Sequence, residues 1–314
     1  MKRSKVIITE NGSKHRSRLI KAIQSLDNLD DYALMPQGVW GSTATIKCGG
    51  VTIKSSELDF EFEVPFDDNL ESKEGNITIY NLSDNTIKQL KKDMSISIEA
   101  GYEGDTGVIF KGYIAKPSTR REGADKVTTL KIIDSIYQKE SLDIAYASGT
   151  TASYILRDLF NRTKLSFGKF EVERDHTYGS GVNIDEPLES AIKRFSEICG
   201  ISTWTSKGKI YSCGLKKVSN IMSFARDNTF DVSENTGMIG SPSPFEEQNS
   251  ISVEDKDYID TLKGFEIEML MQHRAAVGAV VNLKSEQYTG KYYIKSGVHR
   301  FNTSECITTI KVVA

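Results

Sequence analysis

The sequence predicts an α+β protein that is mainly β, in which two β-rich parts are separated by a small α/β insertion. Apolar residues recur at every second position over residues 39–139, the period of a strand with one buried face. The period becomes helical over residues 148–213 and returns to two after residue 249. With 314 residues, the chain is long enough for two or three domains.

The composition describes a soluble globular protein, with 38% hydrophobic and 26% charged residues. A net charge of −3 argues against a general polyanion-binding protein. The charges are unevenly placed, because residues 1–21 hold seven Lys/Arg against Glu10, whereas residues 55–75 hold eight Asp/Glu against Lys73. The basic segment is either a solvated tail or an arm that orders on an acidic partner.

Residues 1–37 are expected to form an N-terminal basic extension, with a short helix around residues 17–26 and a break at Pro36-Gln-Gly38. The early apolar run at residues 6–8 is too short for a signal peptide. No segment approaches the ~20 apolar residues of a membrane helix, so we expect no stable membrane insertion. The protein is expected to fold in a cytoplasm. The four cysteines form no CxxC pair and are expected to be buried free thiols.

The first β part spans residues 38–147 and is expected to open with a hairpin of residues 43–48 and 51–54, joined by Gly49-Gly50. Residues 58–64 alternate strictly, which places four apolar side chains on one face of a strand and carboxylates on the other. These carboxylates are Asp59, Glu61 and Glu63. A short helix over residues 86–90 follows, with Ser83 or Asp84 as its N-cap.

Residues 148–215 are expected to form the inserted α/β domain. Residues 152–161 carry an apolar stripe at helical spacing, and a second helix is predicted over residues 187–199. Pro187 suits the first position of that helix, and Gly200 suits the position just past its end. Residues 201–205 and 209–213 read as the two strands of a hairpin.

Residues 216–314 are expected to form a crossover followed by the second β part. The crossover, residues 216–247, is polar and contains the turn-like Ser241-Pro-Ser-Pro244. Strands are predicted over residues 264–269, 277–283, 291–294 and 307–313. The two β parts echo each other, which predicts a structural repeat. Gly107-Val-Ile-Phe-Lys leads to Thr128-Thr-Leu-Lys-Ile-Ile133, as Gly290-Lys-Tyr-Tyr-Ile leads to Thr308-Thr-Ile-Lys-Val-Val313.

Catalytic, cofactor-binding and metal-binding motifs are not found in the sequence. The histidines, His15, His176, His273 and His299, fall in four different regions and are expected to be surface or locally satisfied groups. An acid/base pair needs two carboxylates in different environments, but Asp59, Glu61 and Glu63 share one strand face. They are better explained as an acidic wall past which a polyanion such as DNA can slide.

Several motifs together resemble the tail hub, or late-control-type baseplate hub, of phages and related contractile injection systems. They are Asn76-Ile-Thr-Ile-Tyr-Asn-Leu-Ser83, Ala100-Gly-Tyr102, Gly107-Val-Ile-Phe-Lys-Gly-Tyr-Ile114, the helix and hairpin of residues 190–212, and Gly290-Lys-Tyr-Tyr-Ile-Lys-Ser-Gly-Val-His299. No single motif is specific. Their order and spacing carry the resemblance, which touches most of residues 38–313 but not the N-terminal extension.

The resemblance implies two tube-like split β-barrel domains in each chain and a ring of three chains. Six similar units would adapt a six-fold tail tube to a three-fold spike and line a channel. The implied partners are two further copies of the chain, the tail tube protein, the central spike, the tape-measure protein and baseplate wedge proteins. DNA would pass without specific binding, with Asp59, Glu61 and Glu63 facing the channel. The expected location is the virion tail or baseplate, assembled in the bacterial host cytoplasm.

The leading hypothesis is therefore a structural hub with no enzymatic activity. Two alternatives remain open at this stage: a tail-associated cell-wall-degrading enzyme, and a receptor- or carbohydrate-binding tail protein. Some hubs carry a fused cell-wall hydrolase, but this chain ends at Ala314 directly after its last predicted strand, so we expect none. An adhesin would need aromatic clusters on loops, and Trp40 and Trp204 give little support for one.

Overall fold

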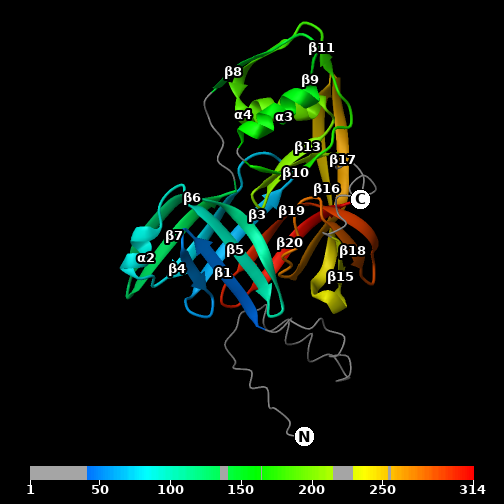
Figure 1. The fold of residues 1–314 in the computed structure, drawn as a ribbon. Coiled ribbons are helices and arrows are strands. Elements are labelled where there is room, and N and C mark those ends of the chain that lie inside the picture. The colour runs from blue at the N-terminus through cyan, green and yellow to red at the C-terminus, as the bar shows by residue number, and fades with distance from the viewer. Residues whose placement is uncertain (1–40, 135–140, 164, 215–228, 254–255) are drawn as a thin grey trace.

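The protein is described by a computed structural model that covers residues 41–134, 141–163, 165–214, 229–253 and 256–314. It is mainly β, as the sequence predicts. Figure 1 shows two β-rich parts side by side, with a smaller part that contains α3 and α4 at their upper end. The predicted basic extension, residues 1–37, and the helix predicted within it lie outside the described residues. Within the described ranges, no helix combines the length and apolar character needed to cross a membrane.

The first β part consists of seven strands and the short helix α2. The elements are β1 (Ser42–Cys48), β2 (Val51–Lys54), β3 (Phe60–Asp67), β4 (Glu74–Tyr80), α2 (Asp84–Gln89), β5 (Ser95–Tyr102), β6 (Asp105–Glu122) and β7 (Asp125–Ile133). Hydrogen bonding orders the strands β2-β1-β5-β6-β7-β4-β3. The predicted hairpin turn is present, with φ of 51° at Gly49 and 91° at Gly50, a conformation that favours glycine. Ser83 is the N-cap of α2, because its Oγ accepts a hydrogen bond from the Thr86 N–H at 3.1 Å.

The inserted part packs two helices against short strands. Its elements are β8 (Ser141–Tyr146), β9 (Thr150–Thr151), α3 (Ala152–Arg162), β10 (Ser166–Phe170), β11 (Thr177–Tyr178), β12 (Val182–Pro187), α4 (Leu188–Ile198), β13 (Ser202–Ser206) and β14 (Lys209–Cys213). Both predicted helices are present, although Pro187 is the N-cap of α4 and not its first residue. β8 pairs with β12, so it belongs with these elements although it precedes residue 148. The predicted domain boundaries themselves stay a prediction.

The second β part contains six strands. They are β15 (Thr229–Ser233), β16 (Met238–Val253), β17 (Lys256–Leu270), β18 (Val280–Lys284), β19 (Thr289–Phe301) and β20 (Cys306–Val313), with the 3-10 helix η2 (Glu234–Thr236) after β15. The prediction of a crossover over residues 216–247 is wrong for its second half, which forms β15 and the start of β16. The prolines of Ser241-Pro-Ser-Pro244 suggested a turn. They lie instead beside a register shift in a strand at the sheet edge, where proline is tolerated.

The two β parts share one strand order. The second part runs β15-β18-β19-β20-β17-β16, which matches β1-β5-β6-β7-β4-β3 strand for strand. The two differ at one end, because β1 and β5 are antiparallel whereas β15 and β18 are parallel. β2 has no counterpart among the described strands. The sequence echo therefore falls on equivalent hairpins, β6–β7 and β19–β20.

The register of these hairpins also matches. Tyr113 pairs with Ile133 and Tyr293 pairs with Val313, and each hairpin then has a register shift after the next residue. The correspondence makes Gly290 the equivalent of Phe110, not of Gly107 as the sequence echo suggests. The sequence echo thus matches the correct strands, β6 with β19, but aligns them three residues out of register.

The two β parts join through a seam, which we define as residues 62–67 of β3 paired antiparallel with residues 296–301 of β19. It merges the strands of both parts into one 13-stranded sheet within the described residues. The Phe62 and Phe301 rings stack at 5.4 Å between centroids, and Phe66 lies 5.0 Å from the His299 ring. A hydrogen bond of 2.7 Å from the Tyr102 hydroxyl to the Cys306 carbonyl adds a second link.

A charged cluster, here called the clasp, joins all three parts of the chain. Arg274 donates to both carboxylate oxygens of Asp105 at 2.9 and 2.8 Å, and His273 Nε2 lies 2.9 Å from the same carboxylate. The Lys207 ammonium, at the β13–β14 turn, donates to the His273 carbonyl at 2.6 Å. The Arg274 hydrogen bond is the main cause that lowers the pKa of Asp105, and burial lowers the pKa of Lys207 to about 8.

All four cysteines are buried and free, as the sequence predicts. The expectation for histidine is wrong at one position, because His299 is fully buried at the seam. Its Nδ1 lies 2.9 Å from Thr308 Oγ1, and its Nε2 has no hydrogen-bond partner among the described residues. Burial is the main cause that lowers the pKa of His299 to about 3, and the nearby Lys207 and His273 act in the same direction.

We expect the protein to become less stable as the pH is lowered, because of His299. Its folded pKa lies below its unfolded value, so the unfolded chain binds the extra proton, and stability is lost as pH falls from about 6.5 toward about 3. Wild type should lose up to about 1.4 kcal/mol per pH unit more than a His299→Gln variant over that range. Urea unfolding of both proteins between pH 7 and pH 5 measures the difference. Parallel pH dependence in the two proteins would show that His299 makes no such contribution.

The clasp should contribute measurably to stability. Asp105→Asn removes the charge from a bidentate ion pair that is half exposed, and we expect a loss of about 1–2 kcal/mol in unfolding free energy. Glu103→Gln, two residues away on the same turn, is the matched control and should cost much less. Unfolding midpoints that are equal for the two variants would contradict a stabilising role for the clasp.

Candidate assembly surface

The predicted acidic residues lie on one exposed face of the sheet. Asp59, Glu61 and Glu63 are exposed, while Phe60 and Phe62 between them are buried in the core of the first β part. The strict alternation of the sequence therefore gives the predicted two faces. We refer to these three carboxylates as the acidic strand. The structure brings them together with residues from the other β part.

Arg300 is the charged neighbour that sequence reasoning missed. It is directly opposite Glu63 across the seam, and its Nε donates to the Glu63 carboxylate at 3.3 Å. The two residues are 237 positions apart, so no local signal in the sequence could indicate the pair. Glu61 lies near Tyr80, whose pKa is raised, first by desolvation and then by the Glu61 carboxylate.

The pairing registers extend this face across both β parts. Lys131, Asn76, Glu63 and Arg300 form one row across β7, β4, β3 and β19. A parallel row on the second part runs through Ser296, Lys311, Glu266 and Ser243 on β19, β20, β17 and β16. The face is therefore continuous across the seam, and each row places one carboxylate opposite a basic side chain, Glu63 opposite Arg300 and Glu266 opposite Lys311.

The surroundings of these carboxylates are open and polar. Asp59 and Glu61 of the acidic strand and the residues around Tyr80 line a shallow hollow of about 320 Å³ that contains no histidine or cysteine. Over the described part of the chain, no three His, Cys, Asp or Glu side chains gather in a way that could hold a metal ion. His273 meets Asp105 only within the clasp, His176 packs edge-on against Tyr178, and His15 lies outside the described residues.

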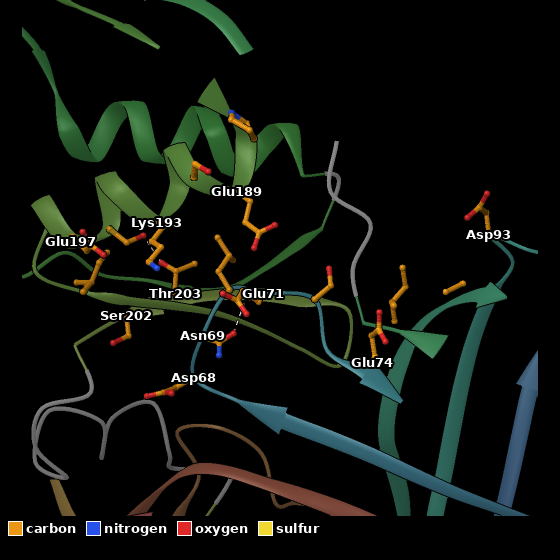
Figure 2. A pocket seen from close by; sticks show the side chains of 18 of the residues that line it. Asp68, Asn69, Glu71, Glu74, Asp93, Glu189, Lys193, Glu197, Ser202 and Thr203 are labelled. Carbon is orange, nitrogen blue, oxygen red and sulfur yellow. Dashed lines mark hydrogen bonds between the residues drawn. The ribbon is translucent and has the colours of Figure 1, made fainter. Parts of the chain in front are cut away.

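A larger cleft of about 1030 Å³ lies between the inserted part and the first β part. Figure 2 shows side chains of α4 above the loop that follows β3. Six carboxylates and two lysines line it: Asp68, Glu71, Glu74, Asp93, Glu189, Glu197, Lys92 and Lys193. Burial is the main cause that raises the pKa of Asp68 and of Glu189. Several elements that are distant in sequence build this cleft, which is why no sequence motif marks it.

Comparison with known proteins gives a result at the level of fold. No family model matches the sequence, and no curated protein matches it. Among solved structures, a tail protein from Neisseria meningitidis MC58 aligns with a TM-score of 0.60 and 9% identity, over 88% of this chain and 97% of that one. The 43 kDa tail protein of prophage MuSo2 from Shewanella oneidensis aligns with a TM-score of 0.59 and 9% identity, over 87% and 97% of the two chains. The chain has the fold of phage tail proteins.

A third structure extends the tail-protein fold to a secretion system. It is an E. coli component of the type VI secretion system, described as structurally similar to the T4 bacteriophage tail proteins gp27 and gp5. It aligns with a TM-score of 0.55 and 9% identity, over 85% of this chain and 76% of that one. The resemblance inferred from sequence motifs is thereby confirmed in its fold.

Proposed function

We propose that this protein is a structural hub of a phage tail or a related contractile injection machine, without enzymatic activity. Three copies form a ring that adapts a six-fold tail tube to a three-fold spike. The observation that carries the proposal is the shared strand order of the two β parts, which are joined edge to edge by the seam. Three chains with two equivalent parts each present six similar units on one side and three on the other.

In this proposal the two β parts are tube-like split barrels, residues 38–147 and 216–314, and residues 148–215 are the inserted α/β domain. The continuous exposed face lines the central channel, with Asp59, Glu61 and Glu63 on its wall. Negative charge there repels the DNA phosphates, so DNA passes without binding specifically. The partners are the tail tube, spike, tape-measure and baseplate wedge proteins, and the location is the virion tail or baseplate, after assembly in the host cytoplasm.

The ring should be detectable in the purified protein. We expect light scattering to give a mass of three times 35.0 kDa, about 105 kDa, at sufficient concentration, and negative-stain images with six-fold character. Zymography on purified cell wall should show no clearing with the same sample. A mass that stays at one chain at every concentration and salt condition would contradict the hub assignment, and clearing of the wall would support the enzymatic alternative.

Reversing charge on the acidic strand should create DNA binding. In Asp59→Lys/Glu61→Lys, the Glu63–Arg300 ion pair is left intact, and we expect at least about tenfold stronger retention of duplex DNA at low salt, lost as salt rises. Glu234→Lys/Glu286→Lys makes the same change in charge on other exposed positions of the second part. Equal DNA retention by the two variants would show that the acidic strand has no special position in the ring.

A further inference from the structure

Two sheet edges that correspond to the seam remain open in a single chain. The seam joins β3 of the first part to β19 of the second. The equivalent strands are β16 and β6, and each has a free edge among the described strands. β16 pairs only with β17, and residues 116–121 of β6 pair only with β7. Each copy therefore makes one such strand pairing internally, at the seam. The two strand edges that could make a second pairing of the same kind, on β16 and on β6, stay exposed.

Matching registers show which residues are equivalent on the β6 side. Counting from the shared register shift, Lys116 corresponds to Ser296, Thr119 to His299, and Arg120 to Arg300. Equivalent positions 120 and 300 therefore both hold an arginine. Arg300 reaches across the seam to Glu63 and its side chain is 39% exposed. Arg120 meets only Glu122 of its own strand and its side chain is 71% exposed, so it lacks a partner strand like the one that covers Arg300.

The β16 side is fixed by its pairing with β17. Asn76 and Glu266 hold equivalent places, opposite Lys131 and Lys311. Their partners on the edge strands are Glu63 and Ser243. Pro244 is therefore the equivalent of Val64, and Glu247 is the equivalent of Asp67.

The two open edges carry opposite charge. Residues 116–121 contain Lys116, Arg120 and Arg121 and no acidic residue. Residues 243–247 contain Glu246 and Glu247 and no basic residue, and Glu266 lies beside them on β17. Within the chain, Glu246 is ion-paired with Lys263, and Glu247 with Lys295 and Lys311. Opposite charges on facing strands favour pairing, whereas like charges would oppose it.

We infer that β16 of one copy pairs antiparallel with residues 116–121 of β6 in the next copy, in the register of the seam. Thr119 then lies opposite Pro244, as His299 lies opposite Val64. Arg120 lies opposite Ser243 of the neighbouring copy, as Arg300 lies opposite Glu63, and Glu266 follows on the next strand. The contact joins different surfaces of two copies, so it repeats around a ring. This inference rests on the proposed function, because it specifies how the copies of the hub contact one another.

The composition of the edges suits a contact that forms late. Pro117 and Pro244 have no backbone N–H, which weakens hydrogen bonding along the edge and discourages pairing with unrelated strands. Charge complementarity then selects the correct partner. Thr119 and Arg121 replace His299 and Phe301, so this edge is polar where the seam is apolar.

Disulfide cross-linking tests the register. In the full chain we would introduce Thr119→Cys with Pro244→Cys, since both positions are exposed and the four native cysteines are buried. Directly opposite residues have Cβ atoms about 4.5–5.5 Å apart, close to disulfide geometry, whereas a shift of two residues adds about 3 Å. Mild oxidation should therefore give covalently linked dimers and trimers. Thr119→Cys with Glu246→Cys, two residues out of register, should give at least about fivefold less.

A second measurement uses charge. Arg120→Glu/Arg121→Glu should raise the concentration at which the ring dissociates by about tenfold or more at low salt, while Lys88→Glu on α2 should leave it unchanged. Rings that form normally, with no more cross-linking in the matched cysteine pair than in the shifted pair, would overturn this contact and leave the hub assignment standing. A chain that never associates would overturn both.

Discussion

The seam between β3 and β19 is the contact on which the rest of the structure depends. It pairs residues 62–67 with residues 296–301, which are distant in sequence, and buries the Phe62 and Phe301 rings against each other. Without it the two β parts would be separate sheets, and the exposed face would stop at Glu63. With it, Glu63 and Arg300 become neighbours and one face runs across both parts. The continuity that the proposed channel wall requires thus follows from a single strand pairing.

Local signals in the sequence predicted local structure well. The alternation at residues 58–64, the Gly49-Gly50 turn, the Ser83 cap and both inserted helices were recognised because each depends on neighbouring residues. The start of β16 was missed, because prolines near a sheet edge have the same composition as a turn. β15 was missed with it, as a short strand in the same polar stretch. The Glu63–Arg300 pair, the clasp and the cleft between α4 and the loop after β3 were missed because each joins distant segments. The sequence echo identified the equivalent strands but not their register, since strands reuse the same few residue types.

The equivalent edges of the two β parts differ in the way that their exposure requires. His299 and Phe301 are buried at the seam, which forms when the chain folds and is covered from then on. Thr119 and Arg121 take the same places on β6, where they are exposed in a single chain. An apolar edge at that position would promote aggregation before assembly. In the proposed ring, equivalent strand edges therefore serve as a permanent contact within the chain and as a reversible contact between chains.

The proposed ring closes only if each unit is rotated relative to the next by the correct angle, and the inserted part contacts both β parts within one chain. Its β13–β14 turn carries Lys207 into the clasp, where Asp105 of the first part binds Arg274 of the second. Trp204, also from this hairpin, is fully buried against Val280 and Val313 of the second part. The seam alone is a strand pairing about which two sheets could twist. Contacts from the inserted part to both β parts oppose that twist.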